Sequence, residues 1–193
     1  MSQYGTGPII RYRALRPTSW RNGGGTTREI ATQEIDDGKG YAWRLSLAVI
    51  NEAGSFSEFP DMERVFTVVM GGPVTLTVDG RLHDVERGAP FRFPGDAAVQ
   101  AELPNGPVHA LNVIARHTVV SASVVVEQLR RSRPRPVLFG QCAILLAGRV
   151  TLAVDGAEHA LGVHDTVRCR GRTAAELTGE GLVAVVSFRP AHR

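Results

Sequence analysis

A glycine-rich stretch near the start of the chain holds residues that could bind an anion. It contains Gly23-Gly24-Gly25, preceded by Asn22 and followed by Thr26 and Thr27. Glycine permits positive φ and close backbone approach, so exposed amides here could form a nest for ligand oxygens. A plain glycine turn is the alternative. The stretch lacks the lysine and the following helix of phosphate-binding loops, so it is neither a P-loop nor a dinucleotide fingerprint.

Two arginines further along the chain could hold a carboxylate. In the alternating run Trp43–Ala48, strand geometry places Arg44 and Ser46 on one face, which we expect to line an interior cavity. Arg64 would supply a second guanidinium fork. Each charge-assisted contact is worth on the order of 1.5–3 kcal/mol, so two of them together with backbone amides could support micromolar binding. The alternative is that both arginines form structural ion pairs with Glu29, Glu58 or Glu63.

The elements that must position these residues repeat along the chain. The segment Val74–Gly80 (VTLTVDG) recurs 76 residues later as Val150–Gly156 (VTLAVDG), and the same offset aligns Gly95 with Gly171. Each copy has an apolar run ending in glycine, an alternating strand and an Asp-Gly hairpin turn. Helical periodicity is nearly absent, so the repeat predicts an all-β protein with two similar halves.

The order of these elements resembles the cupin double-stranded β-helix. The resemblance implies two tandem cupin-like barrels, a bicupin, with residues 1–118 as the barrel that carries the ligand site and residues 119–193 as the second. The connector, at about residues 127–136, cannot be a central strand because Pro134 and Pro136 lack backbone donors. We expect it to be solvated, and an anion-binding arm is the alternative.

The positions where cupins usually carry metal ligands hold other residues. Glu58-Phe59-Pro60 stands in place of His-x-His, and Arg64 stands in place of the ligand glutamate. After the turns, Ala97-Ala98 and Arg172–Ala174 offer no donor in either copy. We therefore expect no metal and no other cofactor. An arginine in place of a carboxylate should make the cavity attract an anion.

The composition limits the classes of partner. The chain has 193 residues, a hydrophobic fraction of 43% and a formal charge of +3, with its arginines mostly dispersed, so we expect no nucleic-acid partner. No apolar run approaches the ~18 residues of a membrane span, and the start shows no signal-peptide core. Cys142 and Cys169 are expected to be buried thiols in a cytoplasmic protein. Exposed strand edges would allow a homodimer.

The chain contains three distinctive motifs: W-x-N-G-G-G-T-T-x-E-I, W-R-x-S-x-A, and F-S-x-F-P followed by an arginine. Together they resemble the HutD/Ves family, and the similarity runs through nearly the whole chain. Two positions depart from the family pattern. Asp61 stands where a glycine is expected, and Ala110-Leu111-Asn112 replaces Asp-x-Asn, so one carboxylate is lost.

The resemblance implies a metal-free protein that binds a small carboxylate such as formiminoglutamate and modulates bacterial histidine utilisation without catalysing a step. The ligand-binding residues would be Asn22, Gly23, Gly24, Gly25, Thr26, Thr27, Arg44, Ser46 and Arg64. One alternative is a metal-free isomerase or lyase in which Glu29 or Glu63 acts as general base. Another is an interaction module that uses the arginines of the segment 130–135. The family also covers stress-related roles.

Overall fold

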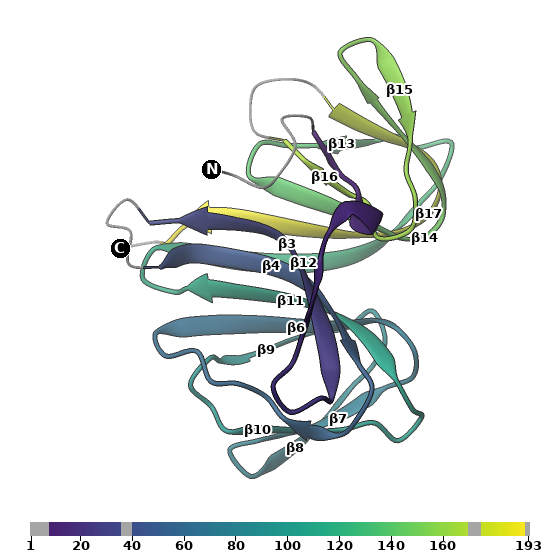
Figure 1. The fold of residues 1–193 in the computed structure, drawn as a ribbon. Helices are drawn as coiled ribbons and strands as arrows, with labels where there is room; N and C mark the ends of the chain where they lie inside the picture. Colours follow the sequence, from purple (N-terminus) through teal and green to yellow (C-terminus); the bar gives the residue numbers. More distant parts are fainter. Residues whose placement is uncertain (1–7, 36–39, 170–174, 192–193) are drawn as a thin grey trace. The chain divides into compact units, whose positions relative to one another are not determined.

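The protein is built almost entirely from β-strands. A computed structural model describes residues 8–35, 40–169 and 175–191 (Figure 1). These residues form 17 strands and one short 3-10 turn, with no α-helix among them. None of them forms a helix long and apolar enough to cross a bilayer. The predicted all-β class is therefore confirmed.

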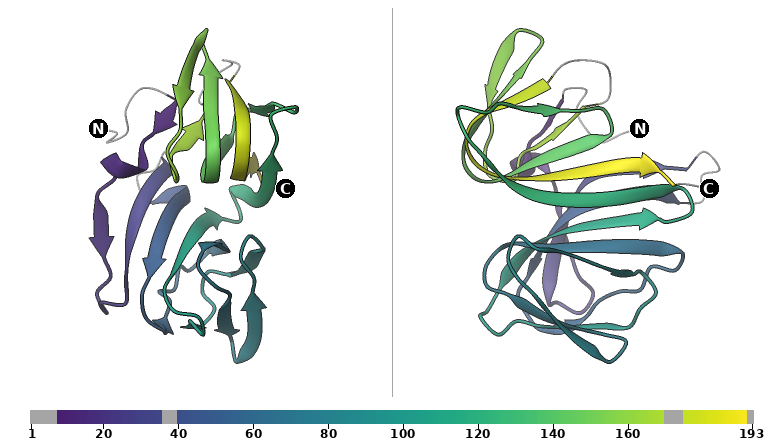
Figure 2. Two further views of the ribbon diagram at one scale, coloured as in Figure 1. Left: turned by 90° about the vertical axis from the view of Figure 1, so that its right-hand side faces the viewer. Right: turned by 180° about the vertical axis from the view of Figure 1, so that it is seen from behind.

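The chain divides into two compact units. The site unit comprises Arg16–Ala122 and the described residues from Pro190 onward. The second unit comprises the described residues up to Leu15 together with Ser123–Arg189. Both units can be followed from two further directions in Figure 2. Each unit is described separately below.

The site unit contains two antiparallel sheets. The six-stranded sheet has the order β2-β3-β4-β11-β6-β9, and the four-stranded sheet has the order β5-β10-β7-β8. In sheet order, the strands are β2 (Pro17–Ser19), β3 (Gly25–Glu34), β4 (Tyr41–Ile50), β11 (Val108–Arg116), β6 (Met62–Met70) and β9 (Pro90–Pro94), then β5 (Gly54–Ser55), β10 (Val99–Glu102), β7 (Val74–Val78) and β8 (Arg81–Val85).

The second unit is built around a seven-stranded antiparallel sheet. Its main path is β1-β16-β14-β17-β12, and β13 and β15 pair with β17 and β14 respectively. The strands are β1 (Ile9–Ile10), β16 (Thr166–Arg168), β14 (Gln141–Val154), β17 (Ala175–Pro190), β12 (Val120–Leu129), β13 (Arg135–Val137) and β15 (Ala157–Ala160). Strand β12 begins in the site unit.

A buried aspartate ties the first described residues to the second unit. The carboxylate of Asp165 accepts hydrogen bonds from Arg11 Nη1 (2.7 Å), the Tyr12 amide (2.9 Å) and the Gly162 amide (2.9 Å). These contacts hold the 3-10 turn Tyr12–Ala14, which follows β1. The segment before Arg16 therefore belongs to the second unit, although it was expected in the N-terminal barrel of residues 1–118.

Both predicted Asp-Gly hairpin turns are confirmed. Asp79 and Gly80 have φ of 47° and 80°, and Asp155 and Gly156 have φ of 51° and 74°. Positive φ at both central residues is the geometry of the tight hairpin turn that Asp-Gly favours. In β7, the residues on one face are buried and those on the other are half-buried, as the alternating sequence predicts.

The two copies differ where their first strand ends. In the first copy, β6 and β7 are separate strands on either side of Gly71-Gly72-Pro73, whereas β14 runs on through Gly148. Pro73 has no backbone N–H, so it cannot continue a hydrogen-bonded ladder. Two closed tandem barrels are not confirmed, because none of the sheets among the described residues closes on itself.

The arginine- and proline-rich segment is not a central strand. Its residues 130–134 are exposed, and Arg130 and Arg133 form an isolated bridge. At Arg135 the chain enters β13, a strand of three residues that pairs with β17. Gly171 and the stretch Arg172–Ala174 lie outside the described residues.

Candidate functional site

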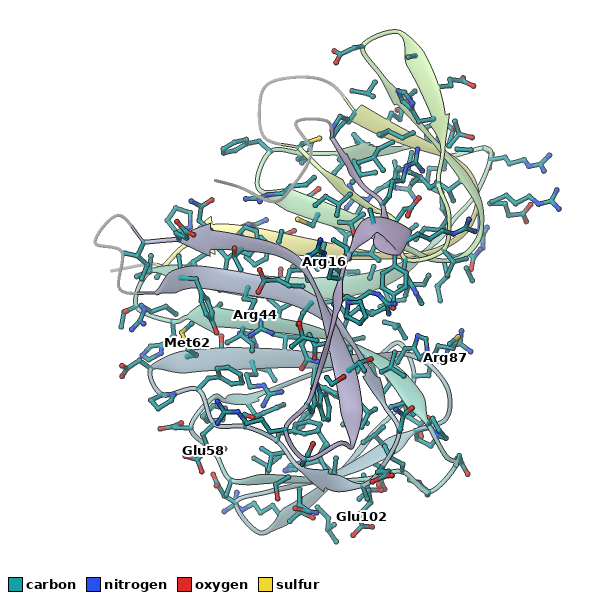
Figure 3. All side chains as sticks on the ribbon, in the orientation of Figure 1. Arg16, Arg44, Glu58, Met62, Arg87 and Glu102 are labelled. Atoms are coloured by element: carbon teal, nitrogen blue, oxygen red, sulfur yellow. The ribbon has the colours of Figure 1, made fainter. Side chains whose placement is uncertain are left out.

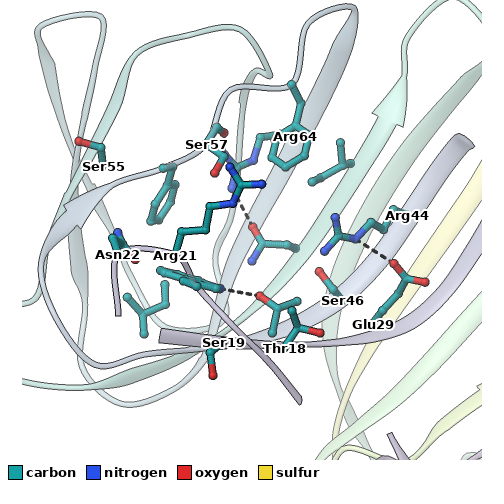
Figure 4. A pocket seen from close by; sticks show the side chains of 17 residues that line it. Thr18, Ser19, Arg21, Asn22, Glu29, Arg44, Ser46, Ser55, Ser57 and Arg64 are labelled. Atoms are coloured by element: carbon teal, nitrogen blue, oxygen red, sulfur yellow. Dashed lines mark hydrogen bonds and ion pairs between the residues drawn. The ribbon is translucent and has the colours of Figure 1, made fainter. Parts of the chain in front are cut away.

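A cavity of about 610 Å³ lies within the site unit (Figure 4). Its wall combines cationic, hydroxyl, amide and aromatic side chains. The residues that line it are Thr18, Ser19, Trp20, Arg21, Asn22, Thr27, Glu29, Arg44, Ser46, Ile50, Ser55, Phe56, Ser57, Phe59, Arg64, Asn112 and Ile114.

Strand alternation in β4 points Arg44 and Ser46 into the cavity, as the sequence predicted. Arg44 Nε lies 3.2 Å from Glu29 Oε2, so these side chains form an ion pair within the cavity wall. The angles do not meet the geometry of a hydrogen bond, and the buried Nε has no hydrogen-bond acceptor among the described residues. The ion-pair alternative is thus correct for Arg44 and Glu29.

Arg64, in β6, is a buried cation that forms no ion pair within the described residues. Its residue exposure is only 6%. Nη1 donates to the Ser57 carbonyl (3.2 Å) and Nη2 donates to Asn112 Oδ1 (3.1 Å), while the buried Nε has no acceptor in the part of the chain that the structure describes. Glu63 pairs instead with Arg92.

Aromatic rings surround the Arg64 guanidinium. Its central carbon lies 5.0 Å from the ring centroid of Phe56, 5.4 Å from that of Phe59 and 5.0 Å from that of Phe93. Desolvation by this burial lowers the pKa of Arg64 to about 10. The rings provide partial compensation through cation–π attraction, but they do not neutralise the charge.

The cavity carries an excess of positive charge. Arg21, Arg44 and Arg64 contribute three positive charges and Glu29 contributes one negative charge, which leaves a formal charge of +2. In Figure 4 the side chain of Arg21 extends over the cavity that Arg64 lines from within. This arrangement favours an anionic occupant, and the guanidinium forks suit a carboxylate.

The glycine triplet shapes the loop beside the cavity. Gly23, Gly24 and Gly25 are not among the lining residues, and neither is Thr26. The Gly23 amide donates to the Trp20 carbonyl (3.1 Å), and the Gly24 amide donates to Asn22 Oδ1 (3.2 Å). The structure therefore engages these two amides within the turn and does not direct them to the cavity, in agreement with the plain-turn alternative.

Close packing explains the last glycine of the triplet. A Cβ atom added at Gly25 would lie 2.5 Å from the Val49 carbonyl oxygen and 3.1 Å from the Trp20 ring. That ring is fixed by a hydrogen bond from its Nε1 to Thr27 Oγ1 (2.8 Å). Gly25 thus permits Trp20 to pack against the start of β3 and to line the cavity.

Five of the nine predicted site residues line the cavity: Asn22, Thr27, Arg44, Ser46 and Arg64. The prediction omitted Arg21, which occupies the unspecified position of the W-x-N motif. It also omitted Asn112, which pairs with Ser46 across β11 and β4. Asn112 is the asparagine of the Asp-x-Asn pattern, but only strand pairing shows that it lies beside Arg64.

The structure accommodates the residues at the two positions that depart from the expected family pattern, Asp61 and Ala110. Asp61 has φ of 62°, a left-handed conformation in which glycine is unstrained and aspartate is tolerated. Ala110 is fully buried in the apolar core with Phe66 and Val68. Asn112, two residues further along β11, retains a place in the cavity wall.

Metal ligands do not converge within the part of the chain that the structure describes. Those residues include no group of three or more His, Cys, Asp or Glu side chains that could hold an ion. Arg64 lines the cavity, and its positive charge disfavours a cation there. The cavity's donor set therefore does not fit a divalent metal.

Comparison with known sequences gives a match over most of the chain. The family model described as HutD matches residues 12–186. Protein Ves from Citrobacter koseri is 41% identical over 121 residues, which cover 59% of this chain and 60% of that protein. An uncharacterized 21.2 kDa protein in the hutC 3′ region of Pseudomonas putida is 31% identical over 169 residues, with coverage of 84% and 86%.

Solved structures give a concordant result. HutD from Pseudomonas fluorescens SBW25 superposes with a TM-score of 0.79 and 28% identity, covering 95% of this chain and 98% of that one. A cupin 2 conserved barrel domain protein from Leptotrichia buccalis superposes with a TM-score of 0.62 and 10% identity, covering 98% and 100%. The second likeness shows that the fold is cupin-like.

Proposed function

The chain belongs to the HutD family, and we propose that it is a metal-free binding protein whose cavity holds a small carboxylate such as formiminoglutamate. In this proposal the occupied protein modulates histidine utilisation and does not catalyse a step of it. The observation that carries the proposal is the buried Arg64 guanidinium, which lines the cavity without an ion-pair partner among the described residues.

The energetics of Arg64 support an anionic ligand. A buried charge is costly unless it is paired, and desolvation already lowers the pKa of this guanidinium. A carboxylate bound beside it would supply the missing negative charge and could accept from the orphaned Nε. Ser46 and Asn22 could add neutral hydrogen bonds from the same cavity wall.

The cavity also has surfaces that suit the carbon skeleton of such a ligand. Trp20, Phe56 and Ile50 line it beside the arginines. Apolar walls with a few convergent polar groups are typical of small-molecule sites. A small acid with a short methylene chain could therefore place its charge on the guanidinium groups and its chain against these rings.

The genetic context of a relative supports the place in metabolism. The Pseudomonas putida relative is described by its position in the hutC 3′ region. The match to Ves spans only about 60% of that protein, so a Ves-like role is a separate proposal and carries less weight.

A metal-free isomerase or lyase is the second candidate. Of the two candidate general bases, Glu29 lines the cavity. Glu63 is not among the residues that line it and pairs with Arg92. Incubation with urocanate or formiminoglutamate, followed by absorbance and ammonia release, separates the candidates. Turnover that disappears in Glu29→Gln would establish catalysis, and unchanged substrate supports binding alone.

The binding proposal is tested by a thermal-shift screen of small carboxylates that includes formiminoglutamate. We expect the ligand to raise the melting temperature of the wild type, and we expect Arg44→Ala and Arg64→Ala to remain folded but lose this rise. Equal stabilisation of the wild type and both variants by the ligand would contradict the proposed site.

A further inference from the structure

The wall of this anion-attracting cavity contains a carboxylate. Glu29 lies in β3, and its Oε2 is 3.2 Å from Arg44 Nε. The Glu29 side chain retains 41% of its exposure, so the ion pair does not remove it from the cavity surface. Figure 4 shows Glu29 and Arg44 meeting along one side of the cavity.

This carboxylate would disfavour a ligand that is only an acid. A second negative charge near Glu29 meets repulsion and competes for Arg44, whereas a charge at Arg64 meets a guanidinium without a carboxylate partner among the described residues. A carboxylate has about four acceptor positions, and 41% of the Glu29 side chain remains exposed, so Glu29 can accept from a ligand in addition to its partners within the protein. A nitrogen donor on the ligand would turn the repulsion into attraction.

We infer that Glu29 is a specificity-determining residue that selects carboxylates bearing a hydrogen-bond-donating nitrogen, such as an ammonium or amidinium group, over plain dicarboxylates of equal length. The inference rests on the proposed function, because it assigns the ligand's acid group to Arg64 in the same cavity. The ligand's nitrogen donates to Glu29. Arg44, which also lines the cavity, holds a second acid group of the ligand.

Two small dicarboxylates of equal chain length form a matched pair of probes. L-Glutamate and glutarate share a five-carbon chain with two carboxylates, and L-glutamate alone carries an ammonium group. Isothermal titration of the wild-type protein with each should show tighter binding of L-glutamate by about tenfold, the size of one hydrogen bond between charged groups after allowance for partial exposure.

The Glu29→Gln variant removes the charge with little change in shape. We expect it to bind glutarate more tightly than the wild type does and to reduce the preference for L-glutamate to about twofold or less. Glu58→Gln is the matched control, since Glu58 is exposed and absent from the cavity wall. Figure 3 shows Glu58 at the rim of the site unit, away from Arg44.

The outcomes separate the two proposals. If the wild type binds both acids and loses both in Arg64→Ala, but binds glutarate as tightly as L-glutamate, the inference about Glu29 is wrong and the anion site stands. A preference that survives unchanged in Glu29→Gln has the same meaning. If the wild type binds neither these probes nor any other small carboxylate, the proposed function fails along with the inference.

Discussion

Replacement of Arg64 by methionine should separate binding from stability. Methionine matches much of the length of the side chain and can pack against Phe56, Phe59 and Phe93 without a charge. Burial is the main cause that lowers the pKa of Arg64 from its ordinary value to about 10, and at about 1.4 kcal/mol for each pH unit the shift corresponds to about 3 kcal/mol against the charged side chain in the folded state. At neutral pH, Arg64→Met removes that unfavourable contribution from the folded state.

The substitution also removes favourable contacts. Two hydrogen bonds are lost, to the Ser57 carbonyl and to Asn112 Oδ1, and these contribute about 1 kcal/mol each. Cation–π attraction to the surrounding rings adds about 1 kcal/mol. Gains and losses therefore nearly cancel, and we expect the unfolding free energy of ligand-free Arg64→Met to lie within about 2 kcal/mol of the wild type.

The assay is urea unfolding with and without a small carboxylate that stabilises the wild type. At a ligand concentration of about 100 times the dissociation constant, the wild type should gain about 2.7 kcal/mol, and Arg64→Met should gain almost nothing. Arg92→Met is the matched control, because Arg92 pairs with Glu63 and does not line the cavity. It should retain the full gain.

Two results would refute this reasoning. Destabilisation of ligand-free Arg64→Met by more than about 4 kcal/mol would identify Arg64 as a structural element whose burial the fold requires. Full ligand-induced stabilisation of Arg64→Met would show that the carboxylate binds elsewhere. Either outcome would remove the support that Arg64 gives to the proposed function.

Three further predictions concern the loop, the cavity mouth and the sheet. Arg21→Ala should weaken carboxylate binding by about three- to tenfold and reduce its salt dependence, measured by titration at low and high salt, because Arg21 is an exposed cation at the cavity. Gly25→Ala should lower the melting temperature far more than Gly23→Ala, since a Cβ at Gly25 meets a backbone oxygen at 2.5 Å, whereas Gly23 has open space and only a strained φ of 76°. Burial, and secondarily the charge of Arg28, lowers the pKa of His109 from its ordinary 6.5, so the folded protein takes up its proton later than the unfolded chain does. The unfolding free energy should therefore fall as the pH drops below about 6.5, and His109→Gln should show a smaller fall in urea titrations; an unchanged fall would exclude His109 as its source.

Features that depend only on residues adjacent in the sequence could be predicted from the sequence. The Asp-Gly turns at Asp79-Gly80 and Asp155-Gly156 were predictable because positive φ is a local property of these residue types. The direction of Arg44 and Ser46 into the cavity was also predictable, since side chains alternate along any strand. Family membership followed from short motifs in the same way.

The composition of the cavity required the tertiary structure. Strand pairing brings Asn112 beside Arg64, although they lie far apart in the sequence. The choice of ion-pair partners has the same origin, because residue types alone do not say whether a glutamate meets Arg44 or Arg92. The glycine triplet shows the opposite limit: its residues permitted an anion nest, but hydrogen bonds within the folded loop engage the amides of Gly23 and Gly24. The sequence determined which groups could bind an anion. Long-range packing decided which of these groups face one cavity and which already have an ion-pair or hydrogen-bond partner within the fold.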